Sequence, residues 1–315
     1  MTALADNVSD QRLLIDLEPV VARELDRHFA TAREWFPHEY VPWSQGEDFS
    51  GPLDGREWSP DEQRFDDATR TSLIVNLLTE DNLPSYHYEI ATILGRDGAW
   101  GQWVGRWTAE EGRHATAIRD YLLVTRSVDP VAMERARMVH MQEGFRAIHP
   151  GVLAGLSYVS FQELATRVSH RNTGAATSDP FAEQLFARIA LDENLHMLFY
   201  RNVIEAAFDI APDQTMEAVW RSVRDFAMPG HGIEGFARKS VAIAVAGIYD
   251  LRQHRDDVVM PVLRKWRVFE REDLGPVGQR ARDELATYMD DMEVSASRFE
   301  EKRDSLKARL QARQD

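Results

Sequence analysis

The chain has 315 residues, a hydrophobic content of 43% and a formal net charge of −15, which argues against binding to nucleic acids or anionic membrane surfaces. It contains no cysteine, so disulfides, thiolate-ligated iron–sulfur clusters and zinc ribbons are excluded. No uncharged apolar run is long enough for a membrane span, and the first ten residues do not resemble a signal peptide, so a cytoplasmic protein is expected.

The N-terminal part is predicted to hold one helix and a long connection. Residues 1–16 are interpreted as an acidic lead-in, and an amphipathic helix is expected at about 17–35. An aromatic, proline-rich segment follows, in which Pro37 and Pro42 end the helix and extend the chain. We expect this segment to pack across the helices by its aromatic rings, before an irregular loop at 44–58.

The next helix is predicted at 60–94. Ser59 suits the N-cap and Pro60 suits the first helical position. Pro84 lies inside this range and has no N–H to bond the carbonyl of Glu80. A kink is therefore expected beside Glu80.

The rest of the chain also has helical patterns. Further helices are predicted at about 99–125, from Asp129–Pro130 to before His149, and at 152–171, 180–210, 213–227, 235–250, 257–268 and 275–312. A polar loop is expected after residue 171, in N-T-G-A-A-T-S. The last helix is heavily charged, which indicates a solvated surface helix.

Six acidic and imidazole side chains recur at regular spacing: Glu80, Glu111, His114, Glu163, Glu193 and His196. They form two Glu-x-x-His pairs, each preceded by a lone glutamate. The first pair follows its glutamate by 31 residues (111 − 80), and the second by 30 residues (193 − 163). The chain therefore repeats one helix-pair unit.

All six side chains continue apolar stripes, so they should point into a core. A buried, unpaired carboxylate costs several kcal/mol, and two divalent cations would neutralise four of them. Carboxylates with imidazoles suit iron or manganese, and this arrangement is the ligand set of ferritin-like dimetal bundles. The alternative is that Glu-x-x-His occurs by chance on exposed helix faces; two copies at matching distances argue against it.

The sequence thus predicts an all-α protein with a ferritin-like four-helix-bundle core and additional flanking helices. We expect one domain over residues 17–315, with its metal-binding core at about 60–210.

Several motifs resemble those of the soluble acyl-carrier-protein desaturases of plant plastids and actinobacteria. They are W-F-P-H-E-Y-V-P, L-T-E-D-N-L-P-S-Y, W-T-A-E-E-G-R-H, F-Q-E-L-A-T and D-E-N-L-H. The resemblance runs from about Trp35 to about Met228. It departs at Gly112, where the plant enzymes have asparagine, but that position is not a ligand.

The resemblance implies a di-iron centre that uses O₂ and two external electrons to form a cis double bond in a fatty acyl chain on acyl carrier protein. It also implies a ferredoxin-type electron donor and a homodimer. The six recurring side chains would be the iron ligands, although manganese stays open. Because the chain has no cysteine, no internal dithiol can supply the electrons.

The same resemblance assigns roles to further residues. Thr166 would line the oxygen side of the site; alternatively, its hydroxyl bonds the carbonyl of Gln162. Trp35 would relay electrons through Asp192, or simply pack. Glu110 and Asp192 would hold the distal N–H groups of ligand histidines, or form surface salt bridges. The other eight histidines are interpreted as ordinary.

Two other classes of function remain open. One is a ferritin-like dimetal oxidase or N-oxygenase with a free small substrate, for which a short polar cavity is expected instead of a long apolar one. The other is a metal-binding scaffold without activity, against which the complete ligand set argues. Docking of an acidic carrier would need a local basic patch. The densest candidates are Arg264, Lys265, Arg267, Arg238 and Lys239.

Overall fold

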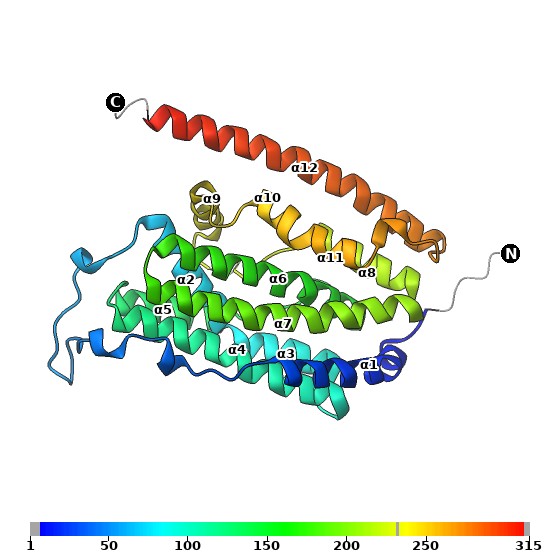
Figure 1. Ribbon diagram of the computed structural model, residues 1–315, viewed down its shortest axis with the longest axis horizontal. Coiled ribbons are helices and arrows are strands. Elements are labelled where there is room, and N and C mark those ends of the chain that lie inside the picture. Colours follow the sequence, from blue (N-terminus) through cyan, green and yellow to red (C-terminus); the bar gives the residue numbers. More distant parts are fainter. Residues whose placement is uncertain (1–6, 231–232, 312–315) are drawn as a thin grey trace.

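The computed structural model describes residues 7–230 and 233–311 (Figure 1). Its α-helices are α1 (Asp10–Thr31), α2 (Asp67–Asp81), α3 (Leu83–Leu94), α4 (Gly98–Val124), α5 (Pro130–Glu143), α6 (Val152–Thr177), α7 (Pro180–Ile210), α8 (Pro212–Arg224), α9 (Phe236–Ala246), α10 (Leu251–Gln253), α11 (Met260–Lys265) and α12 (Pro276–Gln311). The described residues contain no strand beyond an isolated bridge between Phe49 and Arg56. The predicted all-α fold is confirmed.

Helices α2, α4, α6 and α7 form the centre of the molecule, where they run side by side (Figure 1). Helix α6 packs along α7, α2 packs against α4, and α1 lies across α4 and α7. On the other side α8 covers α6, and α12 lies on α8. The two Glu-x-x-His helices, α4 and α7, are therefore enclosed between outer layers.

Aspartate–proline pairs start two of the helices where the sequence predicted. Asp129 and Asp179 accept hydrogen bonds from the first free backbone N–H groups of α5 and α7. The following proline has no N–H to leave unsatisfied and is already set for a helix. In α7, Glu193 and His196 lie among the buried residues of the helix that starts here.

Helix α1 begins earlier than predicted and ends at Thr31 instead of near Trp35. Ser9 caps it by accepting a hydrogen bond from the N–H of Arg12. Its buried stripe starts at Leu13, so part of the expected lead-in belongs to the core. The first six residues of that lead-in lie outside the described part of the chain.

The helix predicted at 60–94 is divided into three elements. Ser59 caps only a short 3₁₀ turn at Pro60–Glu62, and α2 starts later, at Asp67. The expected kink is a complete break: α2 ends at Asp81 and α3 starts at Leu83, with Pro84 in its first turn. Glu80 therefore lies in the last turn of α2.

Helix α6 continues through the predicted loop at 172–177. Thr173 Oγ1 lies 2.7 Å from Ser72 Oγ and accepts a hydrogen bond from Asn76 Nδ2 at 2.8 Å. A Cβ on Gly174 would lie only 2.8 Å from the Cβ of Phe186, so glycine permits close packing on α7. Contacts with neighbouring helices thus override the weak local helix propensity.

The C-terminal part also differs from its prediction. The helix expected at 257–268 is a π-helical segment, His254–Val259, followed by α11. Helix α12 is not fully solvated, because Leu285, Met289 and Met292 are buried. None of the helices in the described residues has the length and apolar character needed to cross a bilayer.

Candidate metal centre

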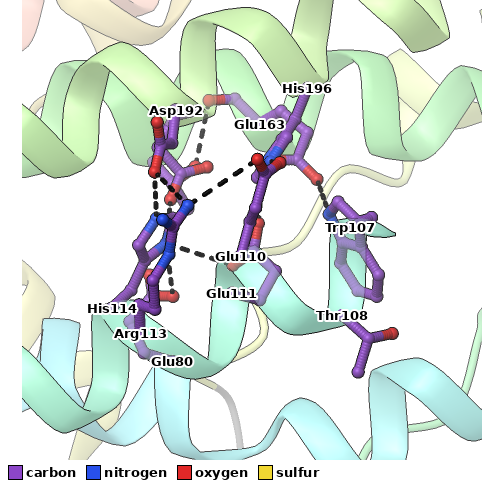
Figure 2. Close-up of polar contacts among 12 residues, drawn as sticks. Glu80, Trp107, Thr108, Glu110, Glu111, Arg113, His114, Glu163, Asp192 and His196 are labelled. Carbon is purple, nitrogen blue, oxygen red and sulfur yellow. Dashed lines mark hydrogen bonds and ion pairs between the residues drawn. The ribbon is translucent and has the colours of Figure 1, made fainter. Parts of the chain in front are cut away.

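The six recurring side chains meet in the middle of the bundle (Figure 2). They form a first ligand group of Glu80, Glu111, His114 and Glu193, and a second ligand group of Glu111, Glu163, Glu193 and His196. Within each group, one ligand atom per residue lies within 4.8 Å of the others, and all are buried. Glu111 and Glu193 belong to both groups, so each can bridge two cations.

Five buried atoms of these side chains have no hydrogen-bond partner: Glu111 Oε1, His114 Nδ1, Glu163 Oε2, Glu193 Oε1 and His196 Nδ1. Some are close to each other, with His196 Nδ1 2.7 Å from Glu111 Oε1, but they are not oriented for a hydrogen bond. Unpartnered buried polar atoms are costly. A cation between them would satisfy them, and carboxylates with imidazoles fit iron or manganese.

The outer nitrogens of the two ligand histidines contact acids in a crossed pattern. Glu110 of α4 lies 3.0 Å from Nε2 of His196 on α7. Asp192 of α7 lies 3.5 Å from Nε2 of His114 on α4. Both acids are buried, so the alternative of surface salt bridges does not fit. Each Glu-x-x-His helix thus orients the imidazole of the other.

Asp192 is held by three further groups. Trp35 Nε1 donates to its carboxylate at 2.7 Å, and Arg188 forms an ion pair with it. Arg113 Nη2 donates to it at 3.1 Å (Figure 2). The guanidinium of Arg113 also lies over the Trp35 ring. Trp35, Asp192 and His114 are therefore in continuous contact, as the predicted relay requires, although the relay itself stays a prediction.

Two buried histidines belong to the site, and their interpretation as ordinary is wrong. His28 of α1 lies 2.9 Å from Glu110, and His170 of α6 lies 2.8 Å from Glu80. A signal existed for both in the sequence. His170 follows Glu163 by seven residues, or two helical turns, and His28 continues the buried stripe of α1.

Two side chains, Trp107 and Thr166, donate hydrogen bonds to two of the ligand glutamates. Trp107 Nε1 donates to Glu163 at 3.0 Å, and Thr166 Oγ1 donates to Glu193 at 2.8 Å. The Thr166 hydroxyl also lies 3.2 Å from the carbonyl oxygen of Gln162, the alternative foreseen from the sequence. The carbonyl oxygen of Glu163 lies 3.0 Å from the same hydroxyl, so three acceptors compete for its one proton.

Burial and mutual repulsion set the protonation of the metal-free centre. Burial, followed by repulsion from Glu111, raises the pKa of Glu163 well above its usual range. Burial alone would lower the pKa of His114 and His196, but the surrounding carboxylates outweigh it and raise both values. Without metal, the imidazoles therefore hold protons that partly balance the carboxylates.

Metal binding is expected to weaken as the pH falls, because a cation must displace these protons. The raised pKa values of His114 and His196 keep both imidazoles protonated near neutral pH. Affinity for Mn²⁺ should fall by about tenfold per pH unit for each proton displaced. Calorimetric titrations at pH 8 and pH 6 measure this, and equal affinities would contradict the assignment.

A pocket lies beside the centre. Glu80 and Glu111 line its buried end, and its walls include Ile90, Ile93 and Val159. At the mouth, His149 Nε2 lies 2.8 Å from Asp225, which joins the segments before α6 and after α8. The pocket therefore offers mostly apolar walls next to the ligand groups.

Comparison with known proteins gives consistent matches. The family model described as "Fatty acid desaturase" matches residues 9–314. A Mycobacterium tuberculosis protein named as acyl-[acyl-carrier-protein] desaturase DesA1 is 52% identical over 305 residues, which cover 94% of this chain and 90% of that protein. A chloroplastic acyl-[acyl-carrier-protein] desaturase 7 of Oryza sativa is 32% identical, covering 78% of this chain and 65% of the rice protein.

The fold has a solved counterpart as well. The X-ray structure named for the acyl-ACP desaturase DesA2 of Mycobacterium tuberculosis superposes with a TM-score of 0.70 at 33% sequence identity. The match covers 85% of this chain and 98% of that structure.

Proposed function

Since this chain belongs to the fatty acid desaturase family, we propose that it is an acyl-carrier-protein desaturase, which introduces a double bond into a fatty acyl chain carried on acyl carrier protein. The observation that carries this conclusion is the complete dimetal ligand set at the buried end of an apolar pocket. The relatives are named as acyl-carrier-protein desaturases, which supports a carrier-bound substrate.

Two iron ions, held by the two ligand groups, would supply the O₂ activation that removal of hydrogen from an unactivated methylene pair requires. The chain's own residues do the rest. The walls around Ile90, Ile93 and Val159 exclude water and align the acyl chain. Glu110 and Asp192 fix the two ligand imidazoles in one orientation and tautomer.

Electrons are proposed to come from a ferredoxin-type protein, because the chain has no cysteine that could supply them. Trp35 and Asp192 form the proposed path toward His114. The carboxylate and imidazole ligands and the membership of the family support the use of iron and O₂. The family also supports a role for Thr166 on the side of the metal centre where O₂ would bind.

The rival reading, an oxidase or N-oxygenase with a small free substrate, is not favoured. Such an enzyme is expected to have a short polar cavity, whereas the walls of this pocket are mostly apolar. The relatives named above also carry desaturase names.

The product decides between these readings. Iron-loaded protein, a ferredoxin system and stearoyl-loaded acyl carrier protein are incubated under ¹⁸O₂, and the acyl group is analysed by mass spectrometry. A product two mass units lighter without ¹⁸O is expected, with the double bond in the cis configuration. A labelled alcohol, or peroxide release with an unchanged acyl group, would favour the oxidase.

We also propose a homodimer that uses the outer side of α5. Large apolar side chains are exposed there: Val131, Met138, Val139 and Met141. A cluster of exposed apolar side chains on one helix is typical of an interaction surface, and the commonest homo-oligomer is a symmetric dimer.

A M138K/V139K variant should be monomeric at micromolar concentration, because two buried charges would face each other across the symmetry axis. Leu191→Lys is the matched control, since Leu191 is an exposed apolar residue on another helix, α7. Analytical ultracentrifugation measures the state. A wild-type monomer, or a dimer that survives the double substitution, would contradict the α5 interface.

The carrier-docking patch stays a prediction. None of the five basic candidates lines the pocket, and two of them are paired, Lys265 with Glu205 and Arg267 with Glu270. The cytoplasmic location inferred from the sequence likewise stays a prediction.

A further inference from the structure

We propose that Trp103 is a protective electron donor: when no acyl chain is bound, its indole gives one electron to the oxidised metal pair and is itself restored through Trp100. This inference rests on the O₂-dependent iron centre proposed above. Trp103 is fully buried on α4 and does not line the pocket beside the centre. It is therefore not placed to contact the acyl chain.

The indole of Trp103 packs against a ligand of the second ligand group. Its ring centre lies 6.0 Å from that of His196, and the two rings are nearly perpendicular, at 80°. It also lies 5.2 Å from the ring centre of His28. Both imidazoles contact the carboxylate of Glu110, at 3.0 Å and 2.9 Å. A negative charge thus lies one side chain away, which favours a positive charge on the indole.

Three tryptophans follow one another along α4: Trp100, Trp103 and Trp107. Residues three and four positions apart on a helix are neighbours. At the inner end, Trp107 donates to the ligand Glu163 at 3.0 Å. At the outer end, Trp100 lies in the first turn of α4, and its Nε1 donates at 3.0 Å to the carbonyl oxygen of the partly exposed Leu14. The row of indoles thus leads from the metal ligands toward the surface.

Packing alone does not explain an indole at position 103. The ring of Trp103 stacks on that of Phe199, with 3.6 Å between centroids. Its Nε1 is buried and has no hydrogen-bond partner among the described residues. A phenylalanine would make the same kind of stacked contact without an unsatisfied N–H group. What the indole adds is the ease with which it loses one electron.

Tyr200 is a second oxidisable side chain at this place, with 5.5 Å between its ring centre and that of Trp103. Burial, followed by repulsion from Glu163, raises the pKa of its hydroxyl well above its usual range. A phenol generally releases its proton when it is oxidised, and this hydroxyl has no acceptor within hydrogen-bond reach in the described part of the chain. An indole can lose an electron and keep its proton. The geometry therefore favours Trp103 over Tyr200 as the donor.

Each event transfers one electron and no atoms. Trp103 becomes an indole radical cation, and its electron goes to the oxidised metal pair. Trp100 then gives one electron to Trp103, and the ferredoxin-type donor proposed above gives one electron to Trp100. The oxidising power of the centre is thus removed before it modifies the ligand imidazoles.

The test exposes iron(II)-loaded protein to O₂ without acyl carrier protein, freezes it rapidly and records its electron paramagnetic resonance spectrum. Wild type should give an organic radical whose signal narrows when the protein contains ring-deuterated tryptophan. Trp103→Phe should lose this signal, and it should be inactivated after fewer cycles of reduction and reoxidation. Trp100→Phe should prolong the signal, because the oxidised Trp103 is restored more slowly.

Two matched variants control for the loss of a buried aromatic group. Trp266→Phe removes another fully buried indole, which packs on Phe161 and Phe208 instead of on a metal ligand. Tyr200→Phe removes only the phenolic hydroxyl. Both should keep the wild-type radical.

Three results would overturn the proposal: an unchanged radical in Trp103→Phe, a wild-type signal that deuterated tryptophan does not alter, or no radical in a wild-type protein that oxidises its iron. The same preparation is also supplied with stearoyl-loaded acyl carrier protein. A desaturated product without the radical would refute the role of Trp103 alone. A tryptophan radical without any change in the acyl group would instead refute the proposed substrate and support the role of Trp103.

Discussion

Replacing Glu111 by alanine is expected to remove both metal ions, whereas replacing Glu80 removes only one. Glu111 belongs to both ligand groups, while Glu80 belongs to the first alone. The E111A protein should therefore contain no stoichiometric iron and no desaturase activity, and E80A should retain one iron per chain. Metal analysis after anaerobic loading and desalting measures the difference.

Stability should follow metal content. A ligand at a hundred times its dissociation constant stabilises the folded state by about 2.7 kcal/mol per site, and E111A loses this contribution at both sites. Metal-free E111A should melt no lower than metal-free wild type, because burial and repulsion from Glu193 raise the pKa of the removed carboxyl. Two iron ions in E111A would contradict the bridging assignment.

Replacing Gly155 by leucine should lower kcat/KM for long acyl chains by about 100-fold, since small displacements of a bound chain cost that much. Gly155 lines the pocket, and a Cβ on it would lie 3.3 Å from Ile93 Cδ1 on the facing helix α3. A leucine side chain would fill the space between α6 and α3. Shorter acyl chains should be affected less, which assays with a series of acyl carrier proteins measure.

Two control variants distinguish blockage of the pocket from general damage to the fold. Gly155→Ala adds only the Cβ, so Ile93 needs to move by a few tenths of an ångström and the effect should be small. The double variant I93A/G155L restores space and should recover activity with long chains. Iron content should be unchanged in all three proteins. A G155L enzyme with the wild-type chain-length preference would show that the acyl chain does not pass this position.

The fold class and the gathering of the six recurring side chains followed from periodicity and charge alone. Apolar residues at helical spacing show which face of each helix points into the core. Carboxylates on that face require a counter-charge, which predicts a metal site. The break at Asn82 was less predictable. Pro84 predicts that the helix is interrupted near this position. Whether the interruption is a kink or a break into two helices depends on the packing around it.

Features set by contacts between distant segments could not be predicted from local patterns. The helix at 172–177 exists because Thr173 and Gly174 pack against α2 and α7. Likewise, the spacing of apolar residues shows that His28 and His170 lie on inward faces of their helices. The neighbouring sequence does not show, however, whether a buried histidine contacts a glutamate or a leucine from another helix. Only the three-dimensional arrangement identifies their partners.

The crossed contacts of Glu110 with His196 and of Asp192 with His114 make the two halves of the chain interdependent. Each repeat supplies the acid that orients the other's imidazole, and Glu111 and Glu193 come from different repeats. Neither repeat alone contains a complete binding site for even one ion. A single repeat could therefore complete a ligand group only by pairing with a second copy, with each acid facing its neighbour's histidine. The covalent link between the two repeats makes this pairing an event within one molecule.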